Sequence, residues 1–250
     1  IKIESLSDST KVIWISRPDK LNALDEYTLK EIMNVIDKLK DEKQIKCLVM
    51  RGEGGKAFSA GGDLSNLRLK NSVEAIKFAK LGQKTTNEIE NFPHPVIAAI
   101  DGYALGGGCE MALACDMRIA TEKSIFSQPE VKLGIMPGWG GTQRLTRIVG
   151  FPKAKEMNYL GSKISAEEAL NIGLINKLVE NGKLDLEIMS ISKKIERLST
   201  TAISLIKETM NKGSQTNLET GLELEAAYFG AAITSEDGKK GINDFLNKQK

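Results

Sequence analysis

Histidine is almost absent from this sequence: His94 is the only one among 250 residues, and it lies between Pro93 and Pro95. This scarcity excludes metal sites that are built from several imidazoles. It also leaves His94 as the only candidate base for a Ser-His-Asp triad, and a histidine just before an apolar run is more typical of a local hydrogen bond. Neither an imidazole-rich metal centre nor a histidine-based triad is therefore favoured.

Cysteine is also rare. Cys47, Cys109 and Cys115 are odd in number and lie inside apolar stretches, which favours reduced, buried thiols in a reducing compartment. The spacing between Cys109 and Cys115 fits no zinc-binding pattern. The sequence therefore predicts a cytoplasmic protein without a metal ion.

Long hydrophobic runs and blocks of one charge are missing as well. The longest apolar stretches, such as residues 96–100, fall far short of the roughly 20 residues that a membrane-spanning helix needs. The net charge is only +2, with basic and acidic residues interspersed, so no basic block indicates nucleic acid or an anionic membrane as a partner. A hydrophobic content of 41% and a charged content of 27% are ordinary for a soluble globular chain.

Glycine, by contrast, is concentrated in two loops. Gly106-Gly107-Gly108 follows an apolar run and precedes an apolar, helix-like segment, where unpaired N–H groups and the helix dipole favour a negative ligand oxygen. A second glycine-rich loop, residues 52–64, follows the apolar run at 45–50. Each loop could supply one N–H to the same oxygen. The alternative interpretation is that the glycines only allow close packing of a helix on a sheet.

Apolar runs alternate with amphipathic segments, which predicts an α/β core. Strands are expected at 12–15, 45–50, 96–100 and 117–121, and helices at 25–40, 73–91 and 110–115. From about residue 153 the pattern is mostly helical. An apolar stripe in this part must dock on the chain's own core or on a neighbouring subunit; it comprises Ile203, Ile206, Met210, Leu218, Leu222 and Phe229.

Two glutamates are candidates for chemistry. Glu110 lies among apolar residues of a predicted buried helix, and a buried carboxylate needs partners or a task. Glu130 follows Pro129 in a glycine-rich neighbourhood. Most glutamates are solvated surface groups, and the spacing alone does not bring these two together.

Four segments, in this order, resemble the crotonase superfamily, specifically its enoyl-CoA hydratases, and the likeness runs nearly end to end. They are Ala60-Gly61-Gly62-Asp63, Gly102 to Glu110, Gln128-Pro129-Glu130 and Pro137 to Arg144. The resemblance implies an α/β fold in which strand-strand-helix units form a spiral over residues 1–195. It further implies a C-terminal helical region at 196–250 that forms homotrimers, commonly paired into homohexamers as dimers of trimers.

The resemblance also implies a site. Ala60 and Gly107 would donate the two backbone N–H groups of an oxyanion hole to the thioester oxygen of an acyl-CoA, and Glu110 and Glu130 would be catalytic. Glu110 would polarise the water and Glu130 would pass the proton at C2. The implied substrate-binding residues are Ser59, Gly61, Asp63, Gly106 and Trp139. No metal and no cofactor is expected, because coenzyme A is part of the substrate.

The expected activity is reversible syn addition of water to trans-2-enoyl-CoA, as in fatty acid β-oxidation, giving 3-hydroxyacyl-CoA. Trp139 stands where the family often has a smaller residue or phenylalanine, and an indole there would shorten the acyl pocket and favour crotonyl-CoA. The alternatives are an enoyl-CoA isomerase, which in this family generally uses one acidic residue, or another acyl-CoA enzyme of this fold. From a different class, a non-catalytic scaffold or an RNA-binding member is the alternative.

Overall fold

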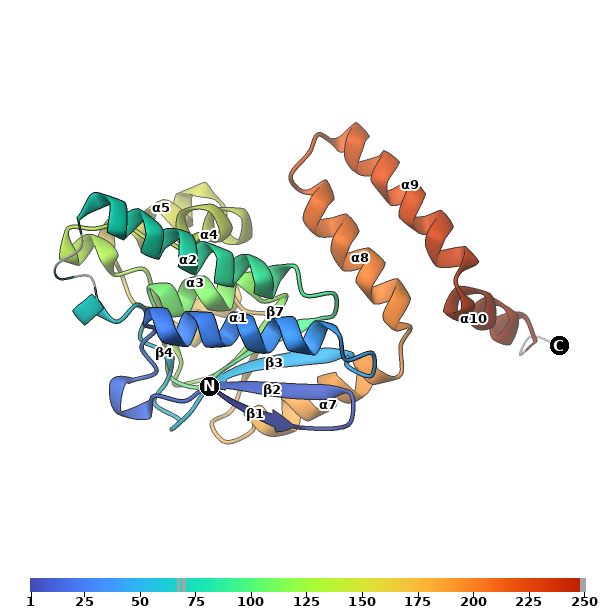
Figure 1. Cartoon of the computed structure of the whole chain (residues 1–250), viewed down its shortest axis with the longest axis horizontal. Coiled ribbons are helices and arrows are strands. Elements are labelled where there is room, and N and C mark those ends of the chain that lie inside the picture. The colour runs from blue at the N-terminus through green and yellow to red at the C-terminus, as the bar shows by residue number, and fades with distance from the viewer. Residues whose placement is uncertain (67, 69–70, 248–250) are drawn as a thin grey trace.

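The computed structural model describes residues 1–66, 68 and 71–247, and Figure 1 shows the whole chain. Residues 248–250, the end of the predicted C-terminal region, lie outside this part. The main sheet has six strands in the order β1-β2-β3-β5-β7-β10. They are β1 (Lys2–Ser5), β2 (Thr10–Ile15), β3 (Cys47–Gly52), β5 (Val96–Ile100), β7 (Met117–Thr121) and β10 (Lys177–Val179). All neighbours pair in parallel except β1 and β2.

A second sheet of four short strands lies at one end of the first, in the order β4-β6-β8-β9. Its strands are β4 (Ala57–Ser59), β6 (Tyr103–Leu105), β8 (Ile125–Ser127) and β9 (Ile164–Ser165). Each of the first three follows directly on a strand of the main sheet, so β3-β4, β5-β6 and β7-β8 are successive two-strand steps. Gly102 makes one of the connecting turns at φ +94°, where an added Cβ would lie 2.1 Å from the Lys56 carbonyl oxygen. The predicted spiral of strand-strand-helix units is confirmed.

Helices cover both faces of the main sheet (Figure 1). On one face lie α1 (Glu26–Lys40), α2 (Ser72–Glu90) and α3 (Gly107–Ala114), and their apolar residues join the larger core cluster. On the other face, α7 (Leu184–Glu196) packs Leu184, Ile188 and Ile195 against the strands. The N-termini are capped as the sequence requires: the Asp25 side chain accepts from Thr28 N, and Asn71 and Glu74 form a capping box.

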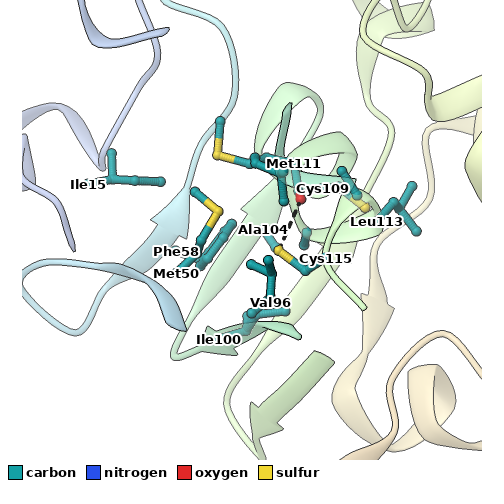
Figure 2. Close-up of a cluster of buried hydrophobic side chains, with 14 of the residues drawn as sticks. Ile15, Met50, Phe58, Val96, Ile100, Ala104, Cys109, Met111, Leu113 and Cys115 are labelled. Atoms are coloured by element: carbon teal, nitrogen blue, oxygen red, sulfur yellow. Dashed lines mark hydrogen bonds between the residues drawn. The ribbon is translucent and has the colours of Figure 1, made fainter. Parts of the chain in front are cut away.

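The central helix α3 is buried on every side, and all eight of its residues are inaccessible to solvent. Figure 2 shows Met111 and Cys109 of α3 among Met50, Phe58 and Ala104, which come from strands of both sheets. The core therefore fixes α3, and with it the glycines at its start, against both sheets at once. Cys47, Cys109 and Cys115 are all free and buried, as predicted.

Three smaller helices complete the compact body: α4 (Gly141–Val149), α5 (Phe151–Leu160) and α6 (Ala166–Asn171). After α7, helix α8 (Thr200–Gly213) still contacts this body, since Lys207 Nζ donates to His94 O at 3.1 Å and pairs with Asp116 at 2.7 Å. Helices α9 (Leu218–Thr234) and α10 (Glu236–Asn247) extend away from it in Figure 1. Among the helices described, none combines the length and the apolar character that a bilayer crossing demands.

The elements predicted from the longest patterns are confirmed, with small shifts at their ends. The predicted helix at 110–115 begins earlier, at Gly107. The short strands β4, β6 and β8, of three residues each, and the helix α4 were not predicted.

Candidate active site

The glycines between β6 and α3 serve different purposes. Gly106 has φ +49° and ψ −123°, and both of its backbone groups are used, since its N–H donates to Ser127 O and its carbonyl accepts from Glu110 N, each at 2.9 Å. A Cβ on Gly108 would lie 2.2 Å from Ser59 O, so Gly108 allows close packing on β4. The N–H of Gly107 precedes the first bond of the helix and has no hydrogen-bond acceptor in the described part of the chain. The glycine run thus combines close packing at Gly108 with an unpaired amide at Gly107, and donation of that amide to a ligand oxygen stays a prediction.

The second glycine loop brings another unpaired amide to the same place. Leu24 forms a parallel bridge with Gly62, in which Leu24 N donates to Gly61 O at 2.8 Å and Asp63 N donates to Leu24 O at 2.9 Å. The Gly62 N–H consequently faces away from Leu24, and no described residue accepts a hydrogen bond from it. A Cβ on Gly61 would lie 3.1 Å from Gly107 N, so the two loops are in contact.

The prediction that Ala60 donates to the ligand oxygen is wrong. Its N–H donates to Leu21 O at 2.9 Å, within the protein. The reason is the pairing of this loop with residues 21–24, which turns the amide of Ala60 inward and leaves that of Gly62 unpaired. Gly62 is therefore the residue that sequence reasoning missed, although the Gly61-Gly62 pair marked the correct loop.

Glu110 is 2% exposed and is held by backbone amides. Its Oε1 accepts from Trp139 N and from Gly141 N, both at 2.7 Å, and Gly141 is the first residue of α4. Burial raises the pKa of Glu110, while the amides of Gly141 and Trp139 and the positive charge of Arg144 favour its charged form. A Cβ on Gly141 would lie 3.0 Å from Glu110 Oε1, so glycine at this position allows the close approach.

Glu130 begins a 3₁₀ turn, Glu130–Leu133, and is half-buried. A Cβ on Gly106 would lie 2.7 Å from Oε1 of Glu130, so the space needed by this carboxylate is a second reason for glycine at position 106. Burial, with the negative charge of Glu110 as a further cause, raises the pKa of Glu130 to about 7. The two glutamates, which the spacing could not join, thus lie within reach of each other's charge.

Gln128 lies against the carboxylate of Glu130 and was not predicted to be functional. It is fully buried, and its side-chain nitrogen lies 3.2 and 3.3 Å from the two carboxylate oxygens of Glu130 when the amide is oriented to donate to them. Its side chain also lies beside Gly141, on the Glu110 side. A buried glutamine two residues before a candidate acid is the signal that could have identified it.

The predicted substrate-binding residues near β4 turn out to hold the loop itself. Ser59 is fully buried, and its Oγ donates to Asn22 O at 2.8 Å and accepts from Gly61 N at 3.1 Å. Asp63 is bonded to the Ser65 hydroxyl and paired with Arg17 and Lys20, which lowers the pKa of Asp63 to about 2. Their polar groups are engaged inside the protein, where they hold the loop, and direct substrate binding by Ser59 and Asp63 stays a prediction.

Gly61 and Gly106 are also engaged within the protein, and substrate binding by these two glycines stays a prediction. Gly61 adopts φ +100°, and its N–H and carbonyl are bonded to Ser59 and Leu24. Gly106 makes room for Glu130, as described above. Trp139, in contrast, is 4% exposed and places its indole directly against Gly62 and Gly107. Of the five residues predicted to bind substrate, Trp139 is the one whose side chain lies beside both glycines with unpaired amides.

The arrangement suits a reaction that develops negative charge on an oxygen and moves a proton. Two unpaired amides can hold a polarised carbonyl, and two carboxylates of different environment can take up and release a proton nearby. Within the described residues, no group of three or more His, Cys, Asp or Glu side chains is placed to hold a metal ion.

Comparisons with known proteins agree on one family. A family model described as enoyl-CoA hydratase/isomerase matches residues 6–250. A short-chain-enoyl-CoA hydratase from Clostridium acetobutylicum and a crotonyl-CoA hydratase from Syntrophomonas wolfei are each 43% identical to the chain, covering 96% of it and 92% of their own length. The crystal structure of an enoyl-CoA hydratase from Bacillus anthracis superposes with a TM-score of 0.95 at 36% identity, over 99% of this chain and 96% of that one.

Proposed function

Because this chain belongs to the enoyl-CoA hydratase/isomerase family, we propose that it is an enoyl-CoA hydratase, a lyase that adds water reversibly to trans-2-enoyl-CoA thioesters. The product is a 3-hydroxyacyl-CoA. The observation that carries the proposal is the pair of buried Glu110 and half-buried Glu130, which lie within reach of each other's charge beside the start of α3. Addition of water needs a base for the water and an acid for carbon, and this pair supplies both.

The amides of Gly62 and Gly107 would bind the thioester oxygen. Hydration at C3 moves electrons through the conjugated system onto this oxygen, so donors fixed there stabilise the enolate more than the substrate. One such donor is typically worth about 3–4 kcal/mol of activation free energy. Ser59 and Asp63 would contribute by keeping the loop in the conformation that leaves the Gly62 amide unpaired.

The two carboxylates would then divide the proton transfers. Oε2 of Glu110, which receives neither of the bonds from Trp139 and Gly141, takes a proton from water as the water oxygen bonds to C3. Attack at C3 breaks the C2–C3 double bond and leaves an enolate, and Glu130 then gives its proton to C2, so the enolate electron pair forms the new C–H bond and the neutral thioester carbonyl is restored. One proton has passed from the pair to the substrate and one from water to the pair. Dehydration is the same path reversed.

No redox cofactor is needed for this chemistry, because adding water leaves the substrate's electron count unchanged. Coenzyme A enters as part of the substrate. A place in fatty acid metabolism, in the β-oxidation sequence, follows from the substrate class.

An isomerase of the same family is the second candidate. Moving a double bond requires one group that removes a proton and returns it at another carbon, for which one acid is sufficient. The second buried carboxylate of this site favours the hydratase. The deciding experiment is the loss of ultraviolet absorbance when crotonyl-CoA is hydrated, run beside an assay with a trans-3-enoyl-CoA. Conversion of the 3-enoyl substrate without hydration of crotonyl-CoA would refute the proposal.

We further propose that residues 196–250 mediate assembly into homotrimers or dimers of trimers. In the single chain, α9 exposes four large apolar side chains, namely Leu218, Leu222, Phe229 and Ile233, and α10 exposes three more, Ile242, Phe245 and Leu246. Apolar area of this extent is normally covered in a native protein. The buried, unpaired cysteines support a cytoplasmic location, where thiols stay reduced.

A further inference from the structure

The indole of Trp139 rests on three glycines from three different segments. A Cβ on Gly82 would lie 2.2 Å from Cδ1 and 2.3 Å from Nε1 of the indole, and a Cβ on Gly107 would lie 2.3 Å from Cζ3. A Cβ on Gly62 would meet Cη2 at 3.5 Å. The five-membered ring thus lies against α2, and the six-membered ring lies against the two glycines whose amides are unpaired. Phe78 packs edge-on at 5.4 Å between ring centroids.

Gly82 has no backbone reason to be glycine. It lies in the middle of α2, outside the set of glycines with positive φ, and glycine weakens a helix there relative to alanine. The only obstacle to a Cβ at this position within the nearest contacts is the indole of Trp139. The presence of Gly82 therefore indicates that space for the Trp139 indole outweighs the helix stability that glycine costs α2.

The backbone of Trp139 is also held by hydrogen bonds, so a shift of the main chain cannot carry the indole aside. Its N–H donates to Glu110, and its carbonyl accepts from Thr86 Oγ1 at 3.0 Å and Arg144 Nη1 at 3.2 Å. The preceding carbonyl, of Gly138, accepts from Gln83 Nε2 at 2.9 Å. The ring is therefore a rigid wall that is anchored to the proposed catalytic glutamate and to α2.

We propose that Trp139, seated on Gly62, Gly82 and Gly107, is the end wall of the acyl pocket and restricts the enzyme to short enoyl chains. This inference rests on the proposed hydratase function. The thioester oxygen must lie within hydrogen-bond reach of the Gly62 and Gly107 amides, and the indole occupies the space directly beside both residues. An acyl chain that runs from the thioester toward Trp139 and continues past C4 therefore meets the ring.

The test is the variant Trp139→Ala, assayed with crotonyl-CoA, hexenoyl-CoA and octenoyl-CoA. A buried methylene is worth roughly fourfold in binding, so opening the wall should raise the ratio of kcat/KM for octenoyl-CoA to that for crotonyl-CoA by about tenfold or more. The smaller ring of Trp139→Phe should give an intermediate ratio. An unchanged ratio in folded Trp139→Ala protein overturns the inference.

Gly82 provides a second, independent test. Gly82→Ala alone should displace the indole and lower both the melting temperature and crotonyl-CoA turnover, whereas in the Trp139→Ala background it should be neutral or stabilising. Equal effects in the two backgrounds would show that Gly82 does not seat the ring. If Trp139→Ala fails to fold, Trp139→Phe and Trp139→Leu carry the same comparison.

Binding separates failure of this inference from failure of the proposed function. Butyryl-CoA and octanoyl-CoA are saturated, so titration calorimetry reports their affinities even if the protein hydrates no enoyl-CoA. The wall predicts that octanoyl-CoA gains affinity relative to butyryl-CoA by about tenfold in Trp139→Ala. Equal ratios in wild type and variant refute the wall. An inactive wild type in which the ratio shifts would refute the hydratase and leave the wall supported.

Discussion

Replacing Glu110 by glutamine removes the proposed base while keeping its shape. The Gln Oε1 can still accept from Trp139 N and Gly141 N, which now hold the carboxylate oxygen at 2.7 Å each. The variant should therefore fold and bind substrate as before. What it loses is the capacity to take a proton from water, and general base catalysis is worth about 10²- to 10⁴-fold.

The expected result is a fall in kcat of that size, equivalent to roughly 3–5 kcal/mol in activation free energy, with KM changed less than about threefold. Glu110→Ala provides the contrast, because it leaves two buried amides without an acceptor. Each unsatisfied amide costs about 1–3 kcal/mol, so Glu110→Ala should lower the free energy of unfolding by roughly 2–6 kcal/mol while Glu110→Gln does not.

The assay is the loss of absorbance of crotonyl-CoA, with urea unfolding for stability. Glu122→Gln is the matched control, since Glu122 is exposed on the turn after β7 and should leave turnover unchanged. Turnover by Glu110→Gln within tenfold of the wild type would refute the assignment of Glu110 as the base.

Three further predictions concern the proton, the oxyanion and the assembly. Hydration and dehydration each require one proton on the glutamate pair, and the pKa of Glu130 is about 7. The kcat/KM of both reactions should therefore fall as the pH rises through about 7. A flat profile from pH 6 to 9 contradicts this prediction. In transverse-relaxation-optimised NMR spectra, butyryl-CoA should shift the amide signals of Gly62 and Gly107 and leave that of Ala60, which is bonded to Leu21; the reverse pattern would restore Ala60 as the donor. Phe229→Glu should dissociate the oligomer in sedimentation experiments, and an unchanged mass would place the interface elsewhere.

Long apolar runs made the central strands of the main sheet predictable. Strands β3, β5 and β7 are buried almost throughout, and apolar residues dominate their sequences; residues 47–50 and 96–100 are continuous apolar runs. Their partners β4, β6 and β8 have only three residues each, too few to show a period of two. Without them no repeat could be recognised from the residues, and the spiral was expected only through the resemblance. The short strands are set by pairing between loops that are distant in sequence, such as β4 with β6.

At the site, too, the functional side chain was predictable from the sequence, whereas the backbone donor was not. Glu110 was recognisable because a charged residue inside an apolar helix is unusual, yet its partners are the backbone amides of Trp139 and Gly141, which the pattern of side chains does not identify. The error at Ala60 has this origin. In a regular extended segment the amides of Ala60 and Gly62 would point to the same side, but Gly61 between them adopts φ +100° and breaks the regular backbone. The amide of Ala60 therefore pairs with Leu21, while that of Gly62 stays unpaired beside the bridge to Leu24. A pattern of side chains carries no record of that break. A reaction whose charge is held by main-chain donors can thus be located in sequence to a loop, while the donating residue follows only from which amides the fold has already used.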